Sequence, residues 1–98
     1  MRLTYHPAAE AELVKAARFY ERKVPSLGSQ FLDAVDRAAA VILKTPERFR
    51  IIEAEVRKVS LRRFPYAIYY RMVSGQIRIL AVKHHSRHPG YWRARLSE

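Results

Sequence analysis

Two apolar segments joined by a tight turn near the C-terminus constrain the fold more than any other part of the chain. Residues 66–73 (YAIYYRMV) and 76–84 (QIRILAVKH) are rich in Tyr, Ile and Val, and Ser74-Gly75 separates them. Such segments favour β-strands, and a two-residue link that contains glycine favours a hairpin. We therefore predict two antiparallel strands here, preceded by a further strand over residues 56–61.

The register of this hairpin predicts which side chains share a face of the sheet. If Ser74 and Gly75 are the loop residues, Val73 pairs with Gln76 and every later pair follows. One face would then carry Met72/Ile77, Tyr70/Ile79 and Ile68/Ala81. The other would carry Tyr69/Leu80 and Ala67/Val82, together with Arg71 opposite Arg78.

We expect helices to cover the first face and the second face to remain open as a docking surface. A three-residue loop would exchange the two faces. The opposed Arg71 and Arg78 are explained equally well as solvated side chains that splay apart or as ligand contacts.

The first half of the chain predicts two amphipathic helices. Pro7 suits the first turn of a helix, Glu10 and Glu12 suit the positive end of its dipole, and apolar residues recur at steps of three and four up to Val24. A second helix follows, with Ser26 or Ser29 as its cap, and it ends near Lys44 because Pro46 lies two residues further on. Residues 1–6 indicate a short strand, 46–55 a loop, and 91–96 a short helical tail.

The predicted fold class is α+β in the order β-α-α-β-β-β. It consists of an antiparallel sheet packed on a two-helix hairpin, with a short C-terminal helical tail. We expect residues 1–98 to form a single domain, because a chain of this length supports one hydrophobic core.

Positive charge is concentrated in the second half of the chain. The formal net charge is +10; residues 1–55 hold nine Lys or Arg and eight Asp or Glu, whereas residues 56–98 hold ten Lys or Arg and only Glu98. Solvated surfaces normally mix both signs. The hairpin region should therefore face a nucleic acid or an acidic protein segment.

Composition disfavours several functional classes. The chain has no cysteine, which excludes disulfides and cysteine-ligated zinc. We find no signal peptide and no apolar run of about 18 residues, so we expect a cytoplasmic protein without membrane contact. His84 and His85 point to opposite faces of a strand and cannot readily share an ion, so we expect no metal, and no motif indicates another cofactor.

Taken in order, these segments resemble the RelE/ParE superfamily of type II toxins, over nearly the whole chain. The matching segments are YHPAAEAELVKAARFYER (5–22), LGSQFLDAVDRAAAVILKTPERF (27–49), LRRFPYAIYYR (61–71) and IRILAVKHHSRHPGYWRARL (77–96). The resemblance implies a bacterial toxin that a cognate antitoxin neutralises by wrapping around it, with operator DNA contacted only through the antitoxin. Antitoxin segments in this superfamily tend to be acidic, which agrees with the basic second half of this chain.

The superfamily contains two mechanisms, and both are hypotheses for this chain. ParE-like members inhibit DNA gyrase without cleaving anything themselves, whereas RelE-like members cut mRNA in the ribosomal A site. Metal-independent cleavage needs a base for the 2′-hydroxyl, an acid for the leaving oxygen and cations on the phosphate. If this chain is a nuclease, its candidate catalytic residues are Arg63, Arg78 and His85.

The start of the central strand favours the ParE-like branch. Where the nucleases have an arginine that opens this strand, the chain has Tyr66 after Pro65, and the pattern FPYAIYY is typical of ParE-like members. The terminal SRHPGYWRARL is also similar to ParE-like chains. We therefore predict a gyrase inhibitor, with a ribosome-dependent mRNA endonuclease as the alternative.

The expected contacts with the target or the antitoxin are basic and aromatic residues of the open face and the tail. Trp92 has two interpretations: it packs the tail onto the sheet, which is the commoner fate of a lone tryptophan, or it anchors a partner. The candidate binding residues are Arg57, Arg63, Tyr69, Arg71, Arg78, Leu80, Arg87, Trp92 and Arg93.

Overall fold

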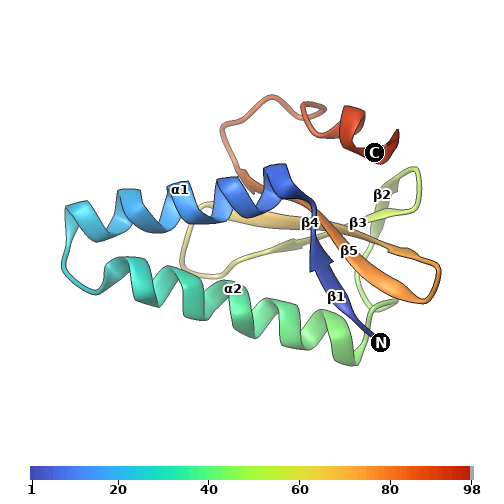
Figure 1. Cartoon of the computed structure of the whole chain (residues 1–98), viewed down its shortest axis with the longest axis horizontal. Helices are drawn as coiled ribbons and strands as arrows, with labels where there is room; N and C mark the ends of the chain where they lie inside the picture. The colour runs from blue at the N-terminus through green and yellow to red at the C-terminus, as the bar shows by residue number, and fades with distance from the viewer. Residues whose placement is uncertain (98) are drawn as a thin grey trace.

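Two helices lie against one face of a five-stranded sheet in the computed structural model, which describes residues 1–97 (Figure 1). The elements are β1 (Leu3–Tyr5), α1 (Pro7–Lys23), α2 (Leu27–Lys44), β2 (Ile51–Glu53), β3 (Val56–Ser60), β4 (Tyr66–Val73), β5 (Gln76–His84) and a 3₁₀-helix, η1 (Arg93–Ser97). The α+β class, the helix hairpin and the short helical tail are confirmed.

The sheet differs from the prediction at both of its edges. The strand order is β1-β5-β4-β3-β2, and β1 pairs with β5 in parallel, whereas the other pairs are antiparallel. The extra strand, β2, lies in a segment that we predicted to be a loop. Its turn into β3 uses Ala54 and Glu55 at positive φ (49° and 63°), a conformation normally signalled by Asn or Gly. The usual hairpin signal is therefore missing from the sequence.

Glu21 and Gly28 fix the junction between the two helices. Ser26 occupies the N-cap position of α2, but its side chain makes no capping bond. The carboxylate of Glu21 instead accepts hydrogen bonds from the backbone N–H groups of Ser26 (2.8 Å) and Gly28 (2.9 Å). A Cβ atom at Gly28 would lie 2.5 Å from the carbonyl oxygen of Ala17, so only glycine permits this close approach.

The register of the β4–β5 hairpin is as predicted beside the turn and shifts further along. The pairs Val73↔Gln76, Met72↔Ile77, Arg71↔Arg78 and Tyr70↔Ile79 form as expected. A β-bulge then leaves Leu80 without a partner, so that the next pairs are Tyr69↔Ala81, Ile68↔Val82 and Ala67↔Lys83. Ala81 consequently joins Leu80 on the face away from the helices, and Val82 turns toward them. The faces that we predicted for Ala81 and Val82 were wrong.

The helix-covered face holds the main hydrophobic core. Its fully buried side chains are Ala9, Phe31, Val35, Ile42, Ile68, Tyr70, Ile77 and Ile79. The ring of Phe31 lies 5.3 Å from Tyr20, 5.2 Å from Phe64 and 5.0 Å from Tyr66, between ring centroids. The predicted stripe of α1 is confirmed up to Tyr20, but Val24 is 52% exposed because it lies beyond the end of the helix.

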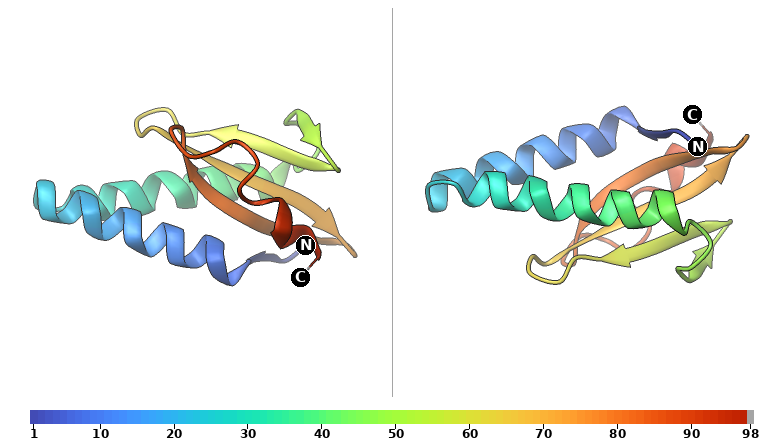
Figure 2. Two further views of the ribbon diagram at one scale, coloured as in Figure 1. Left: turned by 90° about the horizontal axis from the view of Figure 1, so that it is seen from above. Right: turned by 90° about the horizontal axis from the view of Figure 1, so that it is seen from below.

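The second face of the sheet is covered by the chain itself, so the prediction of an open docking face is wrong. Residues 85–97 fold back across it, and Figure 2 shows them in front of the strands from one side and behind the strands from the other. Trp92 is fully buried there and packs on Tyr69, with 5.5 Å between ring centroids, beside Leu80. Packing of the tail is therefore the correct interpretation of Trp92. A partner reaches these three residues only if the tail moves.

Candidate partner-binding site

A largely buried ion pair holds the tail against α1. Glu12 and Arg95 form a two-pronged contact with both N–O distances at 2.9 Å, and their side chains are 16% and 13% exposed. Tyr91 donates its hydroxyl to the same carboxylate at 2.6 Å. Because charged partners roughly double the strength of a hydrogen bond, Glu12 is the principal polar anchor of the tail.

The same two side chains close one edge of the sheet. β1 pairs with residues 77–79 of β5, and beyond them no strand within residues 1–97 lies along the outer edge of β5. There Glu12 accepts a hydrogen bond from the N–H of Val82 (3.0 Å), and Arg95 donates to the carbonyl of Leu80 (2.9 Å). Unpaired strand edges invite pairing with other chains. Glu12 and Arg95 therefore satisfy backbone groups that a sixth strand would otherwise satisfy.

Tyr91 contacts two guanidinium groups. Those of Arg87 and Arg95 lie 4.0 Å and 4.9 Å from the centroid of its ring, within the range of cation–π attraction. Burial raises the pKa of the Tyr91 hydroxyl, and the hydrogen bond to Glu12 raises it further. Tyr91 therefore remains a hydrogen-bond donor at neutral pH.

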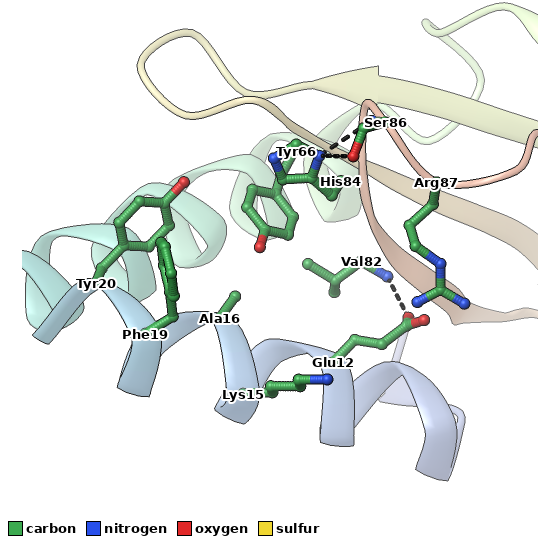
Figure 3. A pocket seen from close by; sticks show the side chains of 10 residues that line it. All are labelled: Glu12, Lys15, Ala16, Phe19, Tyr20, Tyr66, Val82, His84, Ser86 and Arg87. Atoms are coloured by element: carbon green, nitrogen blue, oxygen red, sulfur yellow. Dashed lines mark hydrogen bonds between the residues drawn. The ribbon is translucent and has the colours of Figure 1, made fainter. Parts of the chain in front are cut away.

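A groove of about 340 Å³, here named the α1–β5 groove, lies between α1 and the end of β5 (Figure 3). It is lined by Glu12, Lys15, Ala16, Phe19, Tyr20, Tyr66, Val82, His84, Ser86 and Arg87. Phe19 is 46% exposed, and the charge of Glu12 is compensated by Arg95. Lys15 and Arg87 therefore leave the groove positive beside an apolar wall.

His84 and Tyr66 meet edge to face in this groove, with 5.0 Å between ring centroids. The Nδ1 atom of His84 accepts a hydrogen bond from the N–H of Ser86 at 3.0 Å. The proton of the neutral imidazole is therefore on Nε2, which can donate to a ligand. Burial raises the pKa of the Tyr66 hydroxyl, which favours its role as a donor over a role as a base.

Lys83 is a buried cation for which the described residues supply no carboxylate partner. It is 6% exposed, and its Nζ donates to the carbonyl oxygen of His84 at 3.2 Å. Burial lowers the pKa of Lys83, and the charges of Lys58 and Arg87 lower it further. This end of the sheet therefore carries uncompensated positive charge, as the charge distribution of the sequence indicated.

Arg71 and Arg78 stand opposite each other as predicted, but the chain itself holds both of them. Arg71 donates to the carbonyl oxygen of Leu96 at 2.8 Å, and Arg78 donates to that of Tyr5 at 3.0 Å. Neither guanidinium group is therefore simply solvated, and a contact of either arginine with a partner stays a prediction. Each arginine ties one end of the chain to the sheet.

Arg57 and Arg93 are also engaged within the chain. Arg57 donates to the carbonyl oxygens of Glu47 (3.0 Å) and Phe49 (2.6 Å), which fixes the loop after α2. Arg93 forms an exposed two-pronged ion pair with Glu53 at 2.8 and 2.9 Å. The hydrogen bond from Arg93 lowers the pKa of Glu53. These two arginines therefore connect the β2 region to the rest of the fold.

The three candidate nuclease residues do not share a site. His85 lies at the end of β5 near the loop that holds Arg63, since its N–H donates to the carbonyl oxygen of Pro65 at 2.9 Å. Arg78 lies toward the other end of the same strand, about 20 Å from His85 at roughly 3.3 Å per residue. One phosphate cannot contact all three side chains in this arrangement.

Among the predicted arginines, Arg63 and Arg87 remain available to a partner. Both are exposed, and in the described part of the chain their guanidinium groups make no hydrogen bond or ion pair. Within residues 1–97, no group of three or more metal-ligating side chains is arranged around a common point. Over the same residues, neither helix has the length and apolar character to cross a membrane.

Sequence reasoning missed Glu12, Lys83 and His84 as parts of this site. Glu12 and Arg95 are 83 residues apart, so their pairing leaves no local pattern. The bulge at Leu80 reverses the faces of the residues that follow it, which concealed the side to which Lys83 and His84 point. The only signal for this site in the sequence was that the tail carries more cations than carboxylates.

Comparison with known proteins assigns the class. The sequence model of the family described as "ParE toxin of type II toxin-antitoxin system, parDE" matches residues 3–89. The chain therefore belongs to the ParE toxin family, and the predicted resemblance to the ParE-like branch is confirmed. A search of curated protein sequences finds no match.

A solved structure supports the fold assignment. A chain described as "Chromosomal ParDE TA system from P. aeruginosa" superposes with a TM-score of 0.76, covering 86% of this chain and 95% of that chain. The two sequences are 18% identical. At this identity, the likeness is evidence for the fold alone.

Proposed function

We propose that this protein is the toxin of a type II toxin-antitoxin pair, that it inhibits DNA gyrase by binding, and that an antitoxin neutralises it. Membership of the ParE toxin family supports the toxin role. The separation of Arg63, Arg78 and His85, described above, is the observation that favours gyrase over mRNA as the target. A gyrase target also implies action in the cytoplasm.

Catalysis would require groups that this chain keeps apart. Cleavage of RNA without a metal needs a base, an acid and a phosphate-binding cation around one phosphodiester. Arg78 is bound to the carbonyl oxygen of Tyr5, and Tyr66 occupies the position where the nucleases have an arginine. Binding without cleavage is therefore the activity that these residues support best.

We assign the contact with gyrase to the α1–β5 groove. A half-exposed aromatic side chain, Phe19, lies there beside the cations Lys15 and Arg87. Aromatic and arginine side chains dominate the binding energy of protein interfaces, and exposed cations speed the association with acidic partners. This groove therefore offers the chemistry of a protein-binding site.

An acidic antitoxin segment is the partner that suits the overall charge. The chain carries +10, and Lys83 is buried beside further cations, with no compensating carboxylate among residues 1–97. Complementary charge favours an acidic protein over a neutral one. We propose that operator DNA is contacted through the antitoxin and not through this chain.

A supercoiling assay with purified gyrase and relaxed plasmid tests the proposed target. The wild-type protein should inhibit supercoiling or accumulate cleaved DNA. A Lys15→Glu/Arg87→Glu variant should require a concentration at least about tenfold higher for the same effect. The Arg18→Glu/Arg22→Glu variant changes charge equally at exposed positions of α1 outside the groove, and it should behave like the wild type.

The competing target has its own readout. Translation reactions with purified ribosomes should show no toxin-dependent mRNA cuts. Site-specific cuts in the ribosomal A site, with gyrase unaffected, would overturn the proposal. Thermal unfolding of each variant confirms that a loss of inhibition is not a loss of fold.

A further inference from the structure

A second groove lies on the opposite side of the helix pair, between α2 and β3, and is here named the α2–β3 groove. Its volume is about 380 Å³. The apolar lining residues are Ala34, Ala38, Val41, Phe49, Val59 and Leu61, and the remaining ones include Arg37, Arg48, Arg62 and Arg63. Four arginines therefore line the groove together with its apolar floor, and none of the described lining residues carries a carboxylate.

These four arginines are free to pair with an incoming anion. All are exposed, and within residues 1–97 none of them forms an ion pair or a side-chain hydrogen bond. Arg48 and Arg63 rest over the neighbouring rings of Phe49 (5.6 Å) and Phe64 (5.3 Å), which leaves their N–H groups available. Uncompensated guanidinium groups around a groove favour a ligand with carboxylates.

An unpaired stretch of strand borders the same groove. β2 pairs with Val56 and Arg57 of β3, and the N–H of Lys58 donates to the carbonyl oxygen of Arg50 at 3.4 Å. Among the described residues, no strand covers the outer edge of β3 beyond Lys58. The N–H of Leu61 donates inward to Tyr66, and alternate residues of a strand point their backbone groups to opposite sides. The N–H and C=O of Ser60 therefore point outward, where no strand of the described part of the chain pairs with them.

The groove is held in shape by bonds from the sheet. Arg57 donates to the carbonyl oxygens of Glu47 and Phe49, and the hydroxyl of Tyr70 donates to that of Pro46 at 2.7 Å. These bonds fix the loop that places Phe49 in the wall. A preformed site binds more tightly because less conformational entropy is lost on binding.

We propose that the α2–β3 groove binds an acidic peptide in extended conformation, which adds as a short strand beside Ser60. In a strand, successive side chains point to opposite sides. Every second side chain would therefore face the groove, where apolar ones would pack toward Val41 and Phe49 and carboxylates would pair with Arg37 and Arg62. The inference rests on the proposed function in one respect: the natural source of such a peptide is the antitoxin.

A nucleic acid fits this groove less well. Single-stranded nucleic acids are bound by stacking of bases on exposed aromatic faces. The floor here is mostly aliphatic, and the guanidinium of Arg48 lies over the ring of its one aromatic member, Phe49. Apolar side chains therefore match the floor better than bases do.

Selection from a phage library of random peptides of about twelve residues, against the purified full chain, tests the inference. The enriched peptides should carry both acidic and apolar residues, spaced two apart, at the positions that face the groove. The strongest one, made synthetically, should bind an Arg37→Glu/Arg62→Glu variant at least about tenfold more weakly. It should bind the Arg18→Glu/Arg22→Glu variant as tightly as the wild type, because that pair carries equal charge outside the groove.

Backbone pairing is tested on the peptide, so that the fold of the protein is not disturbed. A strand beside Ser60 uses the N–H groups of only one edge of the peptide. N-methylation of alternate residues along that edge should abolish binding, and N-methylation of the other set should preserve it. The inference would be overturned if no peptide were enriched, or if the enriched peptides had helical periodicity. It would also be overturned if the two charge-reversal variants lost equal peptide affinity, or if the protein bound an oligouridylate more tightly than the peptide.

This experiment separates the inference from the proposed function. If no such peptide binds while the protein still inhibits gyrase, only the inference fails. If wild-type protein leaves gyrase active, the proposed function fails, whatever the peptide does.

Discussion

The two faces of the sheet are covered by different means. α1 and α2, with 17 and 18 residues, cover one face with a continuous apolar core. Residues 85–97 cover the other face with a smaller apolar cluster around Trp92 and with charged bonds such as Glu12–Arg95. Both buried donors that lack a partner in the described residues, the Nε of Arg71 and the Nε1 of Trp92, belong to the tail-covered side.

The contrast between the two faces indicates which part of the molecule can open. Burial of apolar area is not weakened by charge screening, whereas charged bonds weaken when they are exposed to water or screened. The tail also has less apolar contact than the helices, and units with few such contacts open locally before the whole protein unfolds. The helix-covered face therefore sets global stability, and the tail-covered face sets access to Tyr69 and Leu80.

The largest effect is expected on the helix-covered face. Phe31→Ala removes the centre of the aromatic cluster and should lower the free energy of unfolding by about 4 kcal/mol. Urea denaturation measures this loss of stability. The adjacent Leu32 is 38% exposed, and Leu32→Ala should cost less than about 1 kcal/mol. Similar losses from the two variants would show that the face is less well packed than described.

Trp92→Ala should have the next largest effect, with a cost of about 3 kcal/mol or less. The cost is limited because the tail can detach while the helix-covered core stays folded. Trypsin should then cleave after Arg93 and Arg95 much faster than in the wild type. Unchanged protection of these sites would contradict a tail that docks through Trp92.

Glu12→Gln tests the polar half of the tail contact. The variant leaves Arg95 without its carboxylate in a mostly buried position and should cost about 2 kcal/mol. Glu10 is exposed on the same helix, so Glu10→Gln is the matched control and should change stability by less than about 0.5 kcal/mol. Urea denaturation measures the free energy of unfolding of both variants. Equal values for the two would contradict the role of Glu12 as the anchor of the tail.

The smallest expected effect is the alkaline pH dependence of the tail contact. The pKa of Tyr91 is raised above its ordinary value of 10.0, so the folded state holds this proton more tightly than the unfolded state. Its contribution to stability is complete below about pH 10 and is lost as the pH rises above it. Tyr91→Phe removes this contribution, so the melting temperatures of wild type and variant should converge progressively as the pH rises above about 10. Parallel curves would contradict the assignment.

Local signals were sufficient to predict the helices and the central hairpin. Pro7 and Pro25 bracket the first helix, Pro46 ends the second, and Ser74-Gly75 forms the turn between β4 and β5. Each signal acts through the backbone of its own residue or of its neighbours. The positions of these elements could therefore be read without knowledge of the tertiary structure.

The candidate site was predicted much less well, because distant contacts decide it. The bulge at Leu80 inverts the alternation on which the predicted faces depended. Glu12 and Arg95 are separated by most of the chain, and the tail covers a face that the register alone left open. Arg63, Arg87 and Arg93 are exposed, in agreement with the prediction, and of these Arg63 and Arg87 have no hydrogen bond or ion pair from their side chains among the described residues.

Gly28 has a consequence for a site far from it. Any side chain at this position must push the start of α2 away from α1, since a Cβ would stand 2.5 Å from a backbone oxygen. α2 then behaves as a lever about 27 Å long, at roughly 1.5 Å per residue, with Val41 near its other end. A tilt too small to expose the core would change the width of the α2–β3 groove. The absence of a side chain at Gly28 therefore helps to set the width of the α2–β3 groove, although Gly28 does not line that groove.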